Sequence, residues 1–62
     1  MKSWGFADSN GDEITRGWQG RDEHARALAQ RFADERGSAV DYWDEAELLT
    51  GEDGSITVEP TT

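Results

Sequence analysis

The most regular pattern in the chain is the spacing of apolar residues between positions 21 and 37. The apolar positions are Ala25, Leu28, Ala29 and Phe32. Separations of three and four residues place them on one face of an α-helix. Acidic residues open the segment, and arginine followed by Gly37 closes it, as the helix dipole and a left-handed C-terminal cap favour. The sequence therefore predicts an amphipathic helix over residues 21–36.

Residues 2–18 predict a β-hairpin around the turn Ser9-Asn10-Gly11. A two-residue turn would send Ile14 and Trp18 to the wrong face, because a slip of one residue reverses every side chain of a strand. We therefore expect a three-residue turn with Gly11 in the left-handed conformation. The expected cross-strand pairs are Phe6 with Ile14, Trp4 with Arg16 and Lys2 with Trp18. This register places Trp4, Phe6, Ile14 and Trp18 on one face under the helix, with the stem of Arg16 along Trp4.

Residues 38–43 are rich in β-forming residues and are expected to form a third strand. Val40 and Tyr42 lie two residues apart and are expected to face the core. Their neighbour Trp43 must then point the other way. We expect it to be half-exposed among the acidic residues on either side of it.

The last part of the chain contains a second, shorter strand signal. Residues 55–58 alternate, with Ile56 and Val58 inward, before Pro60 ends the strand and residues 59–62 fray. Residues 44–50 fit a short helical turn with Asp44 as its N-cap and Glu47 reaching back. They also fit a strand that pairs with residues 55–58 across the turn at 51–54. Both interpretations remain open.

The element order predicts an α+β fold in a single domain covering residues 1–62, with one amphipathic helix packed on a small, mostly antiparallel sheet. The order is β-β-α-β, then a short element and a last β-strand. Small residues recur along it: Gly17-Trp18, then Ala25, Ala29, Ala33, Gly37 and Ala39-Val40. In these positions the segment 4–43 resembles small uncharacterised bacterial and phage domains of the strand-strand-helix-strand type. The resemblance implies this fold. It implies no activity, because that group of domains has no agreed one.

Charge is the strongest compositional feature, with a net charge of -8 over 62 residues. Residues 1–36 hold all six basic residues, whereas residues 37–62 hold seven acidic residues and no base. Such a field repels DNA, RNA and anionic membranes and attracts basic proteins. The chain has no cysteine and no apolar run that could span a bilayer. Met1-Lys2-Ser3 leads into Trp4 without the apolar segment of a secretory signal, so no secretory leader is expected. We expect a cytoplasmic protein with a small core.

The sequence shows no motif that would place catalytic or metal-binding residues together. The only histidine, His24, falls in the first turn of the helix and is expected in solvent. Asp8, Asn10 and Asp12 match three positions of a calcium-binding loop, but Glu13 and Gln19 stand where that loop needs glycine and glutamate. Adjacent acids elsewhere diverge on helices and strands. We expect no enzyme, no catalytic or metal-binding residue and no cofactor.

The acidic C-terminal half is expected to bind a basic nucleic-acid-binding protein, with carboxylates in place of phosphates and Trp43 as the apolar anchor. The candidate partner-binding residues are Asp41, Trp43, Asp44, Glu45, Glu47, Glu52 and Asp53. Small acidic phage inhibitors, including anti-CRISPR proteins that mimic DNA, are similar in size, charge and lack of a catalytic set. This similarity implies an inhibitor of a protein such as a CRISPR effector. Acidity as solvation or salt adaptation, and self-association as a homodimer, are the alternatives.

Overall fold

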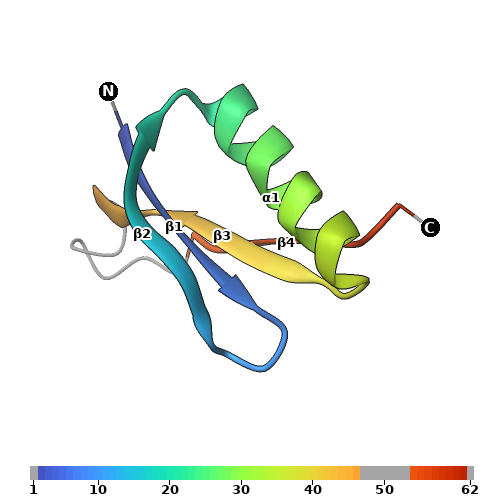
Figure 1. Cartoon of the computed structure of the whole chain (residues 1–62). Helices are drawn as coiled ribbons and strands as arrows, with labels where there is room; N and C mark the ends of the chain where they lie inside the picture. The colour runs from blue at the N-terminus through green and yellow to red at the C-terminus, as the bar shows by residue number, and fades with distance from the viewer. Residues whose placement is uncertain (1, 47–53, 62) are drawn as a thin grey trace.

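One helix lies diagonally across one face of a four-stranded antiparallel sheet in the computed structural model, which describes residues 2–46 and 54–61 (Figure 1). The sheet has the strand order β2-β1-β3-β4. The elements are β1 (Lys2–Asp8), β2 (Glu13–Gly20), α1 (Asp22–Arg36), β3 (Val40–Asp44) and β4 (Ile56–Val58). The predicted α+β class is therefore confirmed. The helix begins one residue later than expected, after Arg21, and ends as predicted at Gly37, whose φ is 65°.

The turn between β1 and β2 has the predicted three-residue geometry. Gly11 has a φ of 86°, and its N–H donates a hydrogen bond of 3.0 Å to the carbonyl oxygen of Asp8. The N–H of Asp8 donates in turn to the carbonyl oxygen of Asp12, at 2.9 Å. Both bonds are those of a type I turn followed by a left-handed glycine.

The predicted register beyond this turn is wrong, because β2 contains two irregularities. The observed pairs are Ala7 with Glu13, Phe6 with Thr15, Trp4 with Trp18, Ser3 with Gln19 and Lys2 with Gly20. They replace the expected pairs Phe6–Ile14, Trp4–Arg16 and Lys2–Trp18. At each irregularity β2 uses one residue more than β1, and Gly17 has a φ of 70°, which glycine adopts without a steric penalty. The bulges nevertheless leave Ile14 and Trp18 packed against the core, as predicted.

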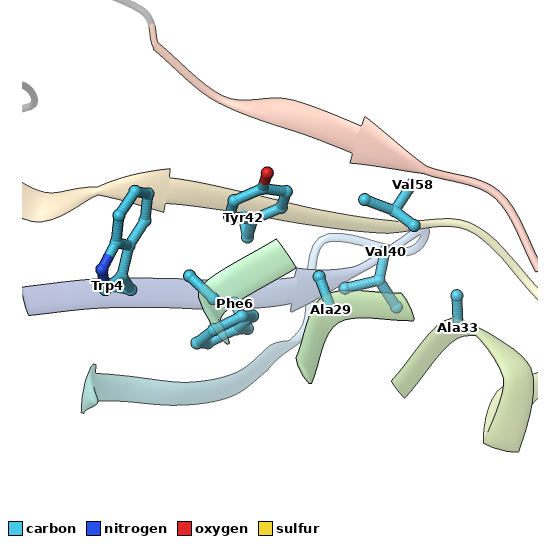
Figure 2. Packing of buried hydrophobic residues seen from close by; sticks show 8 residues of the cluster. Trp4, Phe6, Ala29, Ala33, Val40, Tyr42 and Val58 are labelled. Atoms are coloured by element: carbon cyan, nitrogen blue, oxygen red, sulfur yellow. The ribbon is translucent and has the colours of Figure 1, made fainter. Parts of the chain in front are cut away.

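The core lies between α1 and the sheet, with Phe6 at its centre (Figure 2). The buried side chains are Trp4, Phe6, Ala25, Ala29, Ala33, Val40, Tyr42 and Val58. The ring centroid of Phe6 lies 5.5 Å from that of Phe32 and 6.0 Å from that of Trp18, both in edge-to-face geometry. Alanine at the helix positions lets the backbone of α1 approach the sheet closely. Leu28 and Phe32 are partly buried at the side of this contact.

Of the four residues predicted to face the core from β3 and β4, three are buried and one is not. Val40 and Tyr42 are buried, and so is Val58. Ile56 is 50% exposed, so its predicted burial is wrong. It pairs with Tyr42 at the start of β4, whereas the buried Val58 lies at the other end of the strand.

The segment after β4, residues 59–61, was expected to fray but is hydrogen-bonded to α1. The side chain of Gln30 donates a 2.7 Å hydrogen bond to the carbonyl oxygen of Glu59. The Oδ1 atom of Asp34 accepts bonds from both the N–H and the hydroxyl of Thr61, each at 2.8 Å. The Thr61 backbone N–H, then its hydroxyl and the amide of Gln30, lower the pKa of Asp34 because they stabilise the charged carboxylate. Residues 59–61 are therefore attached to the helix.

Candidate protein-binding surface

The face of the sheet opposite α1 is where the structure places the central residue of the predicted interface. We call this the outer face, and its members alternate with the core residues: Gly5 and Ala7 on β1, Asp41 and Trp43 on β3, and Thr57 on β4. No helix among the described residues covers it (Figure 1). A partner could therefore reach these side chains without displacing any element of the described fold.

Trp43 lies against the backbone of β1 on this face. Gly5 is its cross-strand neighbour, and a Cβ atom at Gly5 would come within 2.4 Å of Cε2 and Cζ2 of the indole. Only glycine leaves room for so close an approach. The ring is consequently half-buried, as predicted.

A hollow of about 390 Å³ opens beside this indole at the hairpin end of the sheet. Its lining residues are Ala7, Asp8, Ser9, Gly11, Asp41, Trp43 and Ser55. The Oδ1 atom of Asp41 accepts a 2.7 Å hydrogen bond from the hydroxyl of Thr57. The Oδ1 atom of Asp8 accepts bonds from the N–H groups of Asn10 and Asp12, both at 2.9 Å. Among the described residues, no hydrogen bond engages the Oδ2 atom of either carboxylate.

Glu45 follows β3 in the chain, and its carboxylate contacts two residues of β2. Its Oε1 atom accepts a 2.6 Å hydrogen bond from the N–H of Gly17 in the β2 bulge. Its Oε2 atom lies 4.0 Å from Nε of Arg16, which also lies 3.2 Å from a carboxylate oxygen of Glu13. Arg16 thus pairs with two glutamates rather than facing Trp4 as the sequence predicted. Glu45 fastens β2 to the chain after β3.

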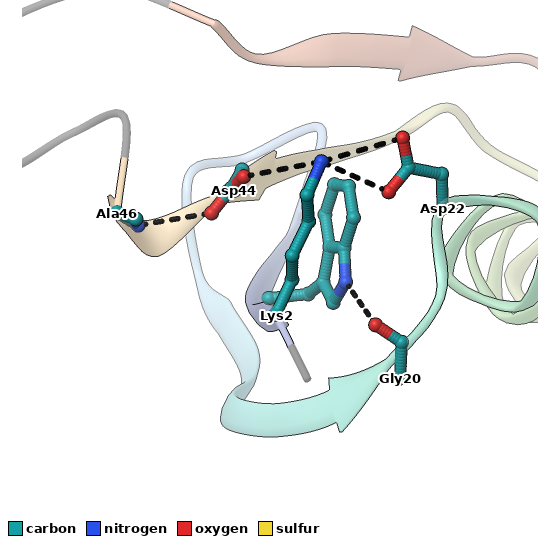
Figure 3. A network of polar contacts seen from close by, with 6 residues as sticks. Lys2, Gly20, Asp22, Asp44 and Ala46 are labelled. Carbon is teal, nitrogen blue, oxygen red and sulfur yellow. Dashed lines mark hydrogen bonds and ion pairs between the residues drawn. The ribbon is translucent and has the colours of Figure 1, made fainter.

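Asp44 is on the other side of the sheet, so its assignment to the surface around Trp43 is wrong. It is 7% exposed, and its Oδ1 atom accepts the N–H of Ala46 at 3.0 Å (Figure 3). Its Oδ2 atom lies 3.8 Å from Nζ of Lys2, which is 3.2 Å from a carboxylate oxygen of Asp22. The same ammonium group lies 5.7 Å from the centre of the Trp4 ring. Asp44 therefore links β3 to the first turn of α1 through Lys2.

The structure brings together only part of the predicted interface. Asp41 and Trp43 meet at the hollow, Glu45 lies apart in an ion pair, and Asp44 faces the helix side. Glu47, Glu52 and Asp53 lie outside the described residues, as does the choice between helix and strand for 47–50. The bond from Ala46 to Asp44 is the one expected of an N-cap.

Asp8 is the lining residue that sequence reasoning missed. Its contribution depends on the pairing of β1 with β3, which places Ala7 opposite Asp41 and brings the hairpin turn beside Trp43. The sequence contained the turn but no signal for this long-range pairing. Asp8 itself stabilises the turn, because its Oδ1 atom accepts hydrogen bonds from the N–H groups of Asn10 and Asp12. These are the three residues whose spacing matches part of a calcium-binding loop.

Other chemistry is not assembled in the described residues. His24 is exposed on the first turn of α1. Within residues 2–46 and 54–61, no three histidine, cysteine or acidic side chains are grouped so that they could hold a metal ion. Over the same residues, no helix has the length and apolar character that crossing a membrane requires.

The chain matches no protein-family model, no curated protein and no solved structure with which it was compared.

Proposed function

We propose that this protein is a small acidic binding module whose outer sheet face docks on a basic protein surface that otherwise binds nucleic acid. The observation that carries the proposal is the half-buried Trp43, held against Gly5 and bordered by Asp41 at an open hollow. Interfaces concentrate their binding energy on buried aromatic anchors, and tryptophan is among the commonest of them. A tryptophan kept in place on an open sheet face is suited to that role.

The distribution of charge supports a basic partner. The helix segment 21–36 contains four arginines and four acidic residues, so it is neutral. Residues 37–62 contain seven acidic residues and no base. This asymmetry speeds the approach of a positively charged surface and favours orientations in which the part of the chain after the helix meets it. It also opposes direct binding of nucleic acid, whose phosphates carry the same sign of charge.

In this proposal the carboxylates occupy the sites that phosphates occupy on the partner, so the module acts as a nucleic-acid mimic. An inhibitor of a phage-targeting nuclease such as a CRISPR effector would need this property. The mimicry would be confined to a small patch, because Glu45 is already paired with Arg16 and Asp44 faces the helix side. Trp43 and Asp41 would therefore carry most of the specificity.

The test is capture of partners from a lysate of the source cells on the immobilised protein, with and without duplex DNA. We expect basic nucleic-acid-binding proteins that DNA and high salt release. Trp43→Ala should abolish capture and Asp41→Asn should weaken it. Glu23→Gln, which makes the same change of charge on the exposed first turn of α1, should capture as the unaltered chain does.

Three outcomes would contradict the proposal. Captured proteins that DNA does not displace would argue against mimicry. Equal weakening by Asp41→Asn and Glu23→Gln would show that only net charge matters, as solvation or salt adaptation predicts. Capture of the protein's own copies alone, with a sedimentation mass that falls on dilution, would favour the homodimer.

A further inference from the structure

The hollow beside Trp43 has a lining of one sign of charge among the described residues. The charged members there, Asp8 and Asp41, are both acidic, and the neutral members are small or, in Trp43, aromatic. The volume of about 390 Å³ lies at the lower end of the range for small-molecule sites. The hollow therefore has room for one side chain and a lining that favours positive charge.

The hydrogen bond already present leaves the Asp41 carboxylate able to receive a donor. The hydroxyl of Thr57 donates to Oδ1 of Asp41, which fixes this side chain without using its Oδ2 atom. A cation entering the hollow would therefore meet a carboxylate already held in position, at a small cost in side-chain entropy. Asp8 is also in the lining, at the hairpin turn, and its negative charge adds to that of Asp41.

A larger hollow, of about 550 Å³, shows the contrast. It is lined by Lys2, Gly20, Arg21, Asp22 and Glu23, and so contains two cations of the chain itself. Lys2 already lies 3.2 Å from Asp22. Among residues 2–46 and 54–61, no basic residue lines the hollow beside Trp43, which makes it the better fit for a cation brought by another protein.

Indole next to carboxylate discriminates between the two basic side chains. A guanidinium is planar and weakly hydrated, so it can stack on an aromatic ring and still donate hydrogen bonds in its plane. An ammonium is compact and strongly hydrated, and loses more on leaving water. We propose that the hollow beside Trp43 and Asp41 receives an arginine side chain of the partner protein. This inference rests on the proposed function and names the group that the partner inserts.

The probe is a capped Gly-Arg-Gly peptide, titrated into the isotopically labelled protein and followed by NMR. Trp43, Trp4 and Trp18 each give a separate indole N–H signal. We expect a saturable shift of the Trp43 indole and of the Ala7 and Ser9 amides, with little change at Trp4. The lysine peptide should bind more weakly. The citrulline peptide, which has the same shape without the charge, should give no saturable shift.

Variants assign the binding to the hollow. Asp41→Asn keeps an oxygen that can accept the Thr57 hydroxyl and should weaken the arginine peptide about threefold, as loss of an exposed ion pair does. Glu23→Gln should leave the affinity unchanged. Trp43→Leu should remove the shifts at Ala7 and Ser9. Equal responses to arginine and citrulline, or equal weakening by Asp41→Asn and Glu23→Gln, would overturn the inference.

The peptide titration and the capture experiment can fail independently, so failure of the arginine site can be told from failure of the proposed function. Selective arginine binding by a protein that captures no nucleic-acid-binding partner would retain the arginine site and remove the mimicry. DNA-sensitive capture without selective arginine binding would retain the mimicry and remove the arginine site.

Discussion

Replacing Gly5 with alanine tests whether the backbone of β1 holds the Trp43 indole in place. The new methyl group would lie 2.4 Å from Cε2 and Cζ2 of the ring, whereas the optimal separation of two carbon atoms is about 3.5–4.0 Å. The Trp43 side chain would have to leave the position it occupies, because the Cβ direction at Gly5 is fixed by the strand. The substitution therefore displaces the anchor without altering it chemically.

The magnitude follows from the surface that the ring covers. A buried tryptophan removes about 150–250 Å² from water, and a half-buried one about 100 Å². At about 25 cal/mol per Å² the complete loss of this contact would cost about 2.5 kcal/mol, which is an upper limit because the ring can settle elsewhere. Alanine returns about 0.5–1 kcal/mol that glycine costs in a strand. We expect the free energy of unfolding to fall by about 1–2 kcal/mol, out of a total of about 3–9 kcal/mol for a chain of this length.

Urea denaturation followed by circular dichroism measures this change, and a double-mutant cycle assigns its cause. In the Trp43→Ala background the methyl group at position 5 meets no ring, so Gly5→Ala should be neutral or stabilise by up to about 1 kcal/mol. An equal loss of stability in both backgrounds would refute the reasoning, since it would show that Gly5 is required for a reason other than Trp43. The Gly5→Ala variant should also bind the arginine peptide more weakly.

Three further changes test other contacts. The lowered pKa of Asp34 means that its bonds stabilise the fold at pH values above its ordinary 3.8 and lose that effect as the pH falls through the lowered value. Asp34→Ala should therefore be destabilising at pH 7, with the difference from the unaltered protein narrowing in acid denaturation series; a difference independent of pH would contradict this. Ala29→Leu should cost about 1–3 kcal/mol in urea denaturation, because overpacking a closed interface is unfavourable, whereas Ala27→Leu on the exposed side of α1 should stay within about 0.5 kcal/mol. Gly17→Ala should cost about 1 kcal/mol because of its left-handed backbone, and an unchanged midpoint would show that the bulge relaxes.

The elements that the sequence predicted well are those that local chemistry decides. The helix over 21–36 follows from spacing and from its Gly37 cap, and the hairpin turn follows from Asn10-Gly11. The inward direction of Val40 and Tyr42 follows from their two-residue spacing. Each of these features depends on residues close in the chain, so no knowledge of the tertiary arrangement was needed.

The features that were missed depend on contacts between distant parts of the chain. The bulge at Gly17 is stabilised by Glu45, 28 residues away, and the sequence shows no link between them. Asp8 joins Asp41 only because β1 pairs with β3. The misplacement of Asp44 is different in kind, since the same alternation that sends Tyr42 inward also sends Asp44 inward. Asp44 is next to Trp43 in sequence, but neighbouring residues of a strand point to opposite faces of the sheet.

The two sides and the two edges of the sheet differ in what they can accept. On the helix side Ala25, Ala29 and Ala33 are fully buried, so a partner could enter there only by opening the core. The edge strand β4 is three residues long, and the other edge strand, β2, is irregular at two positions. Short and bulged edges disfavour the addition of a further strand from a second copy or from a partner. The outer face is thus a surface of the sheet where binding requires no rearrangement of the described fold. Asp41→Asn, which keeps an acceptor for the Thr57 hydroxyl, should for that reason lower the affinity for a partner while leaving the denaturation midpoint nearly unchanged. A lower midpoint with unchanged affinity would argue against a docking role for this face.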